Sequence, residues 1–144
     1  MIYLKPEHLR QMREHGERDY PFECCGLLVG RFLAHGAKEV VEVYPILNAR
    51  EEEAKRNRFL IFPEEVMKVE LYARERRMDV VGGYHSHPDH QAVPSAHDME
   101  HAWPTYSYVI VSVRAGRAYD ILSWEMEADR SRFRQEQVGE SSNL

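Results

Sequence analysis

The segment from residue 83 to residue 100, GYHSHPDHQAVPSAHDME, concentrates imidazole and carboxylate side chains. It contains His85 and His87, two positions apart, and Asp98 further along. Side chains two apart on a β-strand project to the same face, so the two imidazoles can reach one point. Two imidazoles and one carboxylate form a three-ligand set with an open coordination position, which is typical of a catalytic zinc site.

Ser95 lies three positions before Asp98, at the predicted start of a short helix over residues 94–103. Serine is a favoured N-cap residue, and an acid at the third helical position completes a capping pattern. The helix dipole favours an ionised Asp98 in this first turn. Spacing alone leaves two interpretations open: a metal site, or an incidental His-x-His beside an ordinary helix cap.

Three further histidines, His90, His97 and His101, are weaker candidates as ligands. His97 is adjacent to Asp98 and therefore about 100° around the helix, which aims it poorly at the same ion. His101 lies one turn further along that face. His90 is in the connecting loop, where we expect it to be solvated.

A zinc hydrolase also needs a general base beside the metal-bound water. Glu23, in YPFECCG, is a candidate at the start of a buried strand, although it could equally lie at an exposed strand end. Cys24 and Cys25 are rival nucleophiles, but a thiol within an apolar strand is usually inert packing.

Hydrophobic periodicity predicts an α/β protein with a mixed sheet of about five to seven strands and helices packed against it. Pro6 and Pro63 each mark the expected start of a helix. The helices are expected at residues 6–20, 63–77 and 94–103, and the strands at 24–32, 38–47, 59–62, 79–87, 106–113 and 118–124.

The length of 144 residues fits one domain, expected over residues 1–135, with a disordered tail at 136–144. The net charge of −5 argues against nucleic acid or an anionic membrane surface as the partner. No apolar run approaches the roughly 18 residues of a membrane span. The adjacent Cys24 and Cys25 should face opposite ways without a disulfide, which favours a cytoplasmic location.

Taken together, Glu23, the run His85-Ser86-His87-Pro88 and the run ending in Asp98 resemble the JAMM motif of the MPN (Mov34/PAD-1) metallopeptidases. That motif has an upstream glutamate, His-x-His, ten intervening residues (here 88–97) and an aspartate. The stretches YPFECCGLLVG, FPEE, VVGGYHSHP and YSYVIVSV are also similar to the family in order and spacing, over roughly residues 3 to 125.

The resemblance implies that His85, His87 and Asp98 hold Zn²⁺. It implies that Glu23 acts as general base and then acid, and that Ser95 stabilises the oxyanion. A capping Ser95 accepts a hydrogen bond from the backbone and keeps its own proton to donate. The implied fold is a curved mixed sheet flanked by helices, resembling the cytidine deaminases.

The chain resembles the compact bacterial members of this family, which process small ubiquitin-like sulfur-carrier proteins. The implied function is therefore a zinc peptidase or isopeptidase that cleaves after a C-terminal Gly-Gly. The alternative is a non-catalytic MPN scaffold, although such relatives usually lack motif residues that are present here. A third possibility, a zinc deaminase, is weaker because it would require a Pro-Cys-x-x-Cys ligand pair, which the chain does not contain.

Overall fold

Three α-helices and eight β-strands make up the computed structural model over the residues it describes, 1–48 and 61–143. No helix in this part of the chain is long and apolar enough to cross a membrane. The elements in chain order are β1 (Ile2–Leu4), α1 (Pro6–Asp19), β2 (Cys25–Phe32), the 3₁₀ turn η1 (Ala34–Gly36), β3 (Lys38–Ile46), α2 (Pro63–Glu75), β4 (Asp79–Pro88), α3 (Ala96–His101), β5 (Ser107–Arg114), β6 (Arg117–Met126), β7 (Phe133–Glu136), β8 (Val138–Glu140) and the 3₁₀ turn η2 (Ser141–Asn143).

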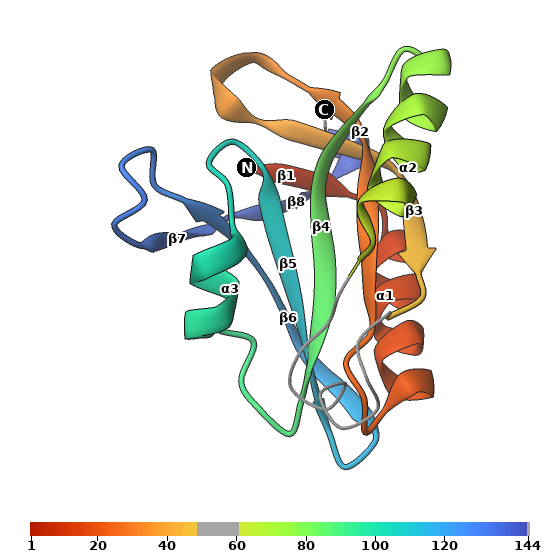
Figure 1. Cartoon of the computed structure of the whole chain (residues 1–144), viewed down its shortest axis with the longest axis vertical. Coiled ribbons are helices and arrows are strands. Elements are labelled where there is room, and N and C mark those ends of the chain that lie inside the picture. The colour runs from red at the N-terminus through yellow and green to blue at the C-terminus, as the bar shows by residue number, and fades with distance from the viewer. Residues whose placement is uncertain (49–60, 144) are drawn as a thin grey trace.

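The strands form one curved mixed sheet in the order β7-β6-β5-β4-β2-β3-β1-β8 (Figure 1). The β4–β5, β1–β3 and β1–β8 pairs are parallel, and the other pairs are antiparallel. The expected mixed α/β fold is thus confirmed, with more strands than predicted. Of the strand expected at 59–62, residues 59–60 lie outside the described part, and 61–62 are not in a strand.

Strand β2 separates two hydrophobic clusters because its side chains alternate between the sheet's two faces. On one face Cys24 and Leu28 join the cluster that contains Met12 of α1. On the other, Cys25, Leu27 and Val29 join the cluster that contains Val69 and Ala73 of α2. The helices therefore cover opposite faces, and the two cysteines point apart and are both free thiols.

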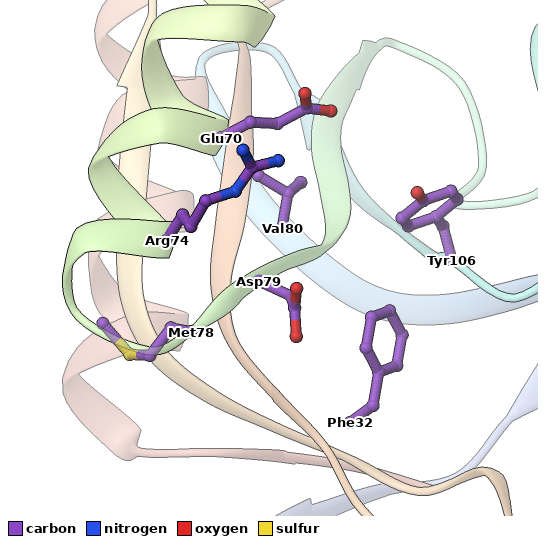
Figure 2. A pocket seen from close by; sticks show the side chains of 7 residues that line it. All are labelled: Phe32, Glu70, Arg74, Met78, Asp79, Val80 and Tyr106. Atoms are coloured by element: carbon purple, nitrogen blue, oxygen red, sulfur yellow. The ribbon is translucent and has the colours of Figure 1, made fainter.

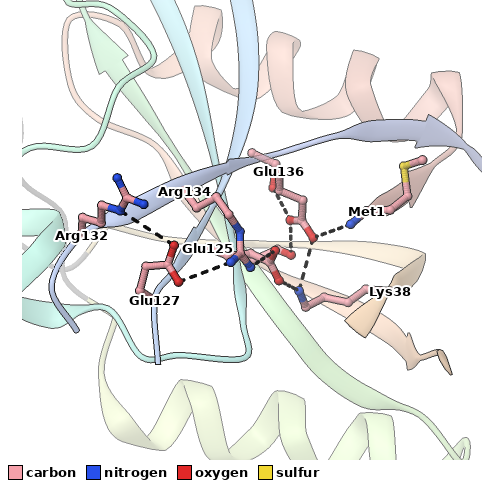
Figure 3. Close-up of polar contacts among 9 residues, drawn as sticks. Met1, Lys38, Glu125, Glu127, Arg132, Arg134 and Glu136 are labelled. Carbon is pink, nitrogen blue, oxygen red and sulfur yellow. Dashed lines mark hydrogen bonds and ion pairs between the residues drawn. The ribbon is translucent and has the colours of Figure 1, made fainter. Parts of the chain in front are cut away.

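A buried polar cluster nearly closes the curved sheet on itself (Figure 3). Lys38 of β3 is 1% exposed, and its Nζ lies 2.6 Å from Glu125 Oε2 of β6 and 3.4 Å from Glu136 Oε2 of β7. Glu136 Oε1 accepts hydrogen bonds from Ser107 Oγ at 2.6 Å and Ser123 Oγ at 2.8 Å. We call Lys38, Glu125, Glu136, Ser107 and Ser123 the seam cluster; it joins strands that are distant in the sheet order.

The structure differs from the disordered tail expected at residues 136–144. Glu136 is buried in the seam cluster, and β8 pairs in parallel with β1, with Val138 opposite Ile2. Only residue 144 of this segment lies outside the described part. The polar composition of this segment suggested disorder. The segment is held instead by pairing with a strand that is distant in sequence and by one buried carboxylate, and neither requires a hydrophobic run.

Candidate metal centre

Strand β4 brings His85 and His87 together as the period of two predicts. Both are buried, and their Nε2 atoms lie 3.1 Å apart. The Nδ1 of His87 is 2.8 Å from the carbonyl oxygen of Gln91. Because a carbonyl can only accept, Nδ1 carries the proton, and the Nε2 lone pair faces the site. Sequence reasoning missed this role of Gln91, since a backbone carbonyl leaves no signal in residue type.

Asp98 reaches the same point from the first turn of α3. Its Oδ1 lies 3.1 Å from His85 Nε2, and its Oδ2 lies 3.3 Å from His87 Nε2. The predicted cap is confirmed, because Ser95 Oγ accepts from the Asp98 N–H at 3.1 Å and the Ser95 N–H donates to Asp98 Oδ2 at 2.8 Å. Burial pushes the pKa of Asp98 up, but hydrogen bonds with the two histidines outweigh it and hold that pKa well below its ordinary value.

The spacing of these three side chains is compatible with a tetrahedral metal ion. Ligands at about 2.1 Å from zinc in a tetrahedron are separated by about 3.4 Å. The two Nε2 atoms lie 3.1 Å apart, and each lies 3.1 or 3.3 Å from a different oxygen of the Asp98 carboxylate. Imidazole nitrogens and a carboxylate are suitable ligands for zinc, and three of them leave one tetrahedral position for water or substrate.

Glu23 lies two residues before the start of β2, close enough to His87 and Asp98 for both to affect its pKa. Strand β2 pairs antiparallel with β4 with Cys25 opposite His85, and continuing that register places Glu23 opposite His87, on the same face. Glu23 is 4% exposed, and burial raises the pKa of its carboxyl to about 8, against a lowering by His87. Such a group is suited to exchanging protons near neutral pH.

Two side chains hold the backbone around Glu23. Asn48 Nδ2 donates to the carbonyl oxygen of Glu23 at 3.0 Å. Ser86, which points away from the two histidines, accepts from the Cys24 N–H through its Oγ at 2.8 Å. Neither role was predicted from the sequence. The position of Ser86 between two histidines on a strand could have suggested a buried hydroxyl that needs a hydrogen-bond partner.

The remaining candidates fall outside the cluster of His85, His87 and Asp98. Among the described residues, His97 and His101 group with Glu100 instead, and His90 is exposed in the loop. Burial raises the pKa of Cys24 to about 12 and also raises that of Cys25. Neither thiol is therefore poised to form the thiolate that a cysteine nucleophile needs.

A groove of about 550 Å³ lies beside the cluster and is lined by residues of the sheet, of α2 and of α3. Figure 1 shows these two helices on either side of β4 and β5. His85 and Asp98 line one part of the groove, and Trp103 and Tyr108 form an apolar wall. Three glycines on neighbouring strands, Gly26, Gly82 and Gly83, are among the sheet residues that line it. A chain with small side chains can therefore approach the sheet closely here.

A second cavity of about 230 Å³ lies next to the groove and shares Glu70, Val80 and Tyr106 with it. Figure 2 shows Glu70 and Arg74 of α2 on one side of this cavity, with Phe32 and Tyr106 on the other. The groove and this cavity are therefore adjacent, with Glu70 of α2 between them.

Comparison with known proteins identifies relatives of similar size. The family model for prokaryotic homologs of the JAB domain matches residues 5–127. The chain is 38% identical over 105 residues to a desampylase of Haloferax volcanii, covering 72% of each chain. It is 32% identical over 120 residues to a probable TtuB-protein conjugate cleaving protease of Thermus thermophilus, covering 83% of this chain and 75% of the relative.

More distant relatives and solved structures agree with this match. A CysO-cysteine peptidase of Mycobacterium tuberculosis is 28% identical over 127 residues, covering 88% of this chain and 83% of the relative. A solution structure from Salinibacter ruber has a TM-score of 0.73 at 39% identity, covering 95% and 91% of the two chains. One from Desulfitobacterium hafniense has a TM-score of 0.81 at 29% identity, covering 96% and 91%. The chain therefore belongs to the prokaryotic JAB-domain family, within the JAMM/MPN group.

Proposed function

We propose that this chain is a zinc-dependent peptidase or isopeptidase that hydrolyses the bond after the C-terminal Gly-Gly of a small ubiquitin-like or sulfur-carrier protein. The observation that supports it most is the convergence of His85, His87 and Asp98 on one point beside the buried carboxyl of Glu23. The relatives named as conjugate-cleaving protease, desampylase and CysO-cysteine peptidase support a substrate of this kind.

In this proposal His85, His87 and Asp98 hold Zn²⁺, which when bound polarises the scissile carbonyl and lowers the pKa of water. Glu23 accepts a proton from the attacking water and later donates it to the leaving amine. Ser95 Oγ, which accepts from the Asp98 N–H, keeps its own proton and donates it to the developing oxyanion.

The groove favours a Gly-Gly tail for a steric reason. Gly82 and Gly83 of β4 line the groove and have no side chains that would keep a substrate backbone away from the sheet. A substrate backbone can approach such a surface only where its own side chains are absent. We place the reaction in the cytoplasm, where free Cys24 and Cys25 would persist.

The test is cleavage of a panel of carrier proteins fused through Gly-Gly to cysteine or to a lysine side chain. Glu23→Gln should lower kcat about 100- to 10,000-fold while one zinc per chain remains bound. Glu14→Gln, on the exposed surface of α1, is the matched control and should keep full activity. Zinc-loaded protein that cleaves no member of the panel would support the scaffold alternative instead. A Glu23→Gln variant with undiminished kcat would show that Glu23 is not the general base.

A further inference from the structure

The exposed side of α3 carries a second group of metal-ligand side chains. His97, Glu100 and His101 follow the spacing i, i+3 and i+4, which places them on one side of a helix. One ligand atom from each lies within 4.8 Å of the others. The two imidazole rings are 4.3 Å apart between centroids and tilted by 36°, so both can face one ion after small side-chain rotations.

The protonation of His101 also suits metal binding. Its Nδ1 lies 2.9 Å from the carbonyl oxygen of His97, one turn earlier. A carbonyl accepts only, so Nδ1 carries the proton and Nε2 keeps a lone pair for a metal. A hydrogen bond from the second ring nitrogen to a backbone carbonyl is a usual support for a metal-ligating histidine.

This group is distinct from the candidate metal centre but faces the same groove. The two sets of ligands share no residue: one is His97, Glu100 and His101, and the other is Asp98 with the two β4 histidines. Adjacent positions on a helix point about 100° apart, which sends the Asp98 carboxylate toward β4 and His97 away from it. His97 and His101 nevertheless line the 550 Å³ groove together with Asp98.

Two imidazoles and one carboxylate select a particular class of ion. Zinc and its neighbours in the first transition row accept this ligand set, whereas Mg²⁺ and Ca²⁺ prefer all-oxygen ligands. Glu100 and His101 are exposed and His97 is half-buried, so water can complete the coordination shell. Side chains near the surface lose more freedom on binding than the buried β4 histidines, which makes this the weaker of the two sets.

We propose that His97, Glu100 and His101 form a second, weaker zinc site at the wall of the groove, and that a zinc ion there inhibits the enzyme. The ion and its water shell occupy space that a substrate tail needs. The binding part of this proposal is independent of the proposed function, whereas the inhibition rests on it.

Zinc stoichiometry tests the binding part without any activity measurement. Wild-type protein is dialysed against a series of free zinc concentrations, and bound zinc per chain is measured by elemental analysis. We expect one zinc at low free zinc and two at high free zinc. His101→Ala and Glu100→Gln should weaken the second zinc by at least about tenfold, the lower range for disturbed metal sites. His35→Asn removes another exposed histidine, outside the group, and should retain both ions.

A wild-type stoichiometry that stays at one overturns the proposal. So does a second zinc that both His101→Ala and Glu100→Gln retain, because that ion would then lie elsewhere. To test the inhibition, the cleavage rate of each protein is measured at high and at low free zinc, and the first rate is divided by the second. This ratio should fall in wild type and in His35→Asn but not in His101→Ala. A second zinc that leaves the wild-type ratio unchanged overturns the inhibition while leaving both the site and the proposed function in place.

Discussion

Replacing Ser86 by alanine isolates how the β2–β4 pairing positions Glu23. The Ser86 hydroxyl accepts the Cys24 N–H at 2.8 Å, and both residues are fully buried. The Ser86 N–H bond to the Cys24 carbonyl, at 3.1 Å, is unaffected by the change. The variant therefore loses the contacts of the hydroxyl with Cys24, and it leaves a buried amide without an acceptor.

The expected cost in stability follows from that unpaired amide. A buried donor that loses its partner costs about 1 to 3 kcal/mol. For a domain of this size such a loss lowers the melting temperature by roughly 3 to 9 °C. Differential scanning calorimetry on the zinc-loaded protein measures this effect directly.

The expected cost in catalysis follows from the position of the amide, one residue after Glu23. Without the Ser86 hydroxyl the start of β2 is held less firmly, and the Glu23 carboxyl shifts relative to the cluster formed by His85, His87 and Asp98. Displacements near 1 Å can cost about 100-fold in rate, so a smaller shift should lower kcat by about tenfold. KM should change little, because Ser86 does not line the groove.

Ser123→Ala is the matched control for this variant. Ser123 is equally buried and donates its hydrogen bond to Glu136 in the seam cluster, remote from Glu23 in the sheet order. It should lower the melting temperature by a similar amount and leave kcat unchanged, with both proteins assayed below their unfolding transitions. An unchanged kcat in Ser86→Ala, with its stability lowered, would refute the positioning role and leave Ser86 only a structural one.

Further predictions concern stability, pH and the groove. Lys38→Met removes the buried ammonium from Glu136 and should lower the free energy of unfolding by about 3 kcal/mol in urea titration; unchanged stability would show that the seam cluster adds nothing. In metal-free protein the pKa of Glu23 is about 8 in the folded state, against 4.5 for an ordinary glutamate in the unfolded chain. The protonated Glu23 therefore contributes to stability fully below about pH 4.5, and this contribution is lost as the pH rises toward and through 8. Between pH 4.5 and 8 the free energy of unfolding of wild type should therefore fall by up to about 1.4 kcal/mol per pH unit more than that of Glu23→Gln. Parallel curves of unfolding free energy against pH for the two proteins would contradict the raised pKa. In Gly26→Ala a new Cβ would lie 2.1 Å from the Tyr84 ring. That variant should lose about 1 to 3 kcal/mol and show a higher KM, and a protein that melts and cleaves like wild type would mean that the ring moves freely.

The parts of the site with local signals were predictable from sequence. His85 and His87 share a face because of the strand period, and Ser95 with Asp98 forms a capping box because the residue types and spacing specify one. Each inference needs only a few consecutive residues. The helices α1 and α2 were predicted for the same reason, with a proline at the first position of each.

The parts that depend on long-range pairing were not predictable. The position of Glu23 opposite His87 depends on the register of two strands about sixty residues apart, and no local pattern encodes a register. The strands β1, β7 and β8 are only three or four residues long, which is too short for a hydrophobic period to reveal them. The seam cluster was not predicted because nothing in the sequence distinguishes Lys38 from the other charged residues. Lys38 is buried only when the curved sheet brings β6 and β7 close to β3.

The closing of the sheet has a consequence for how the chain folds. Lys38 meets Glu136 across 98 positions of sequence, and β1 meets β8 across an even longer span. Contacts so distant in sequence form slowly and late, and during synthesis β8 emerges only after every other strand. Until then β1 is the last strand on that side of the sheet, and its open edge could pair with another chain. The arrival of β8 closes this edge, and the buried pair of Lys38 with Glu136 forms in the same late step.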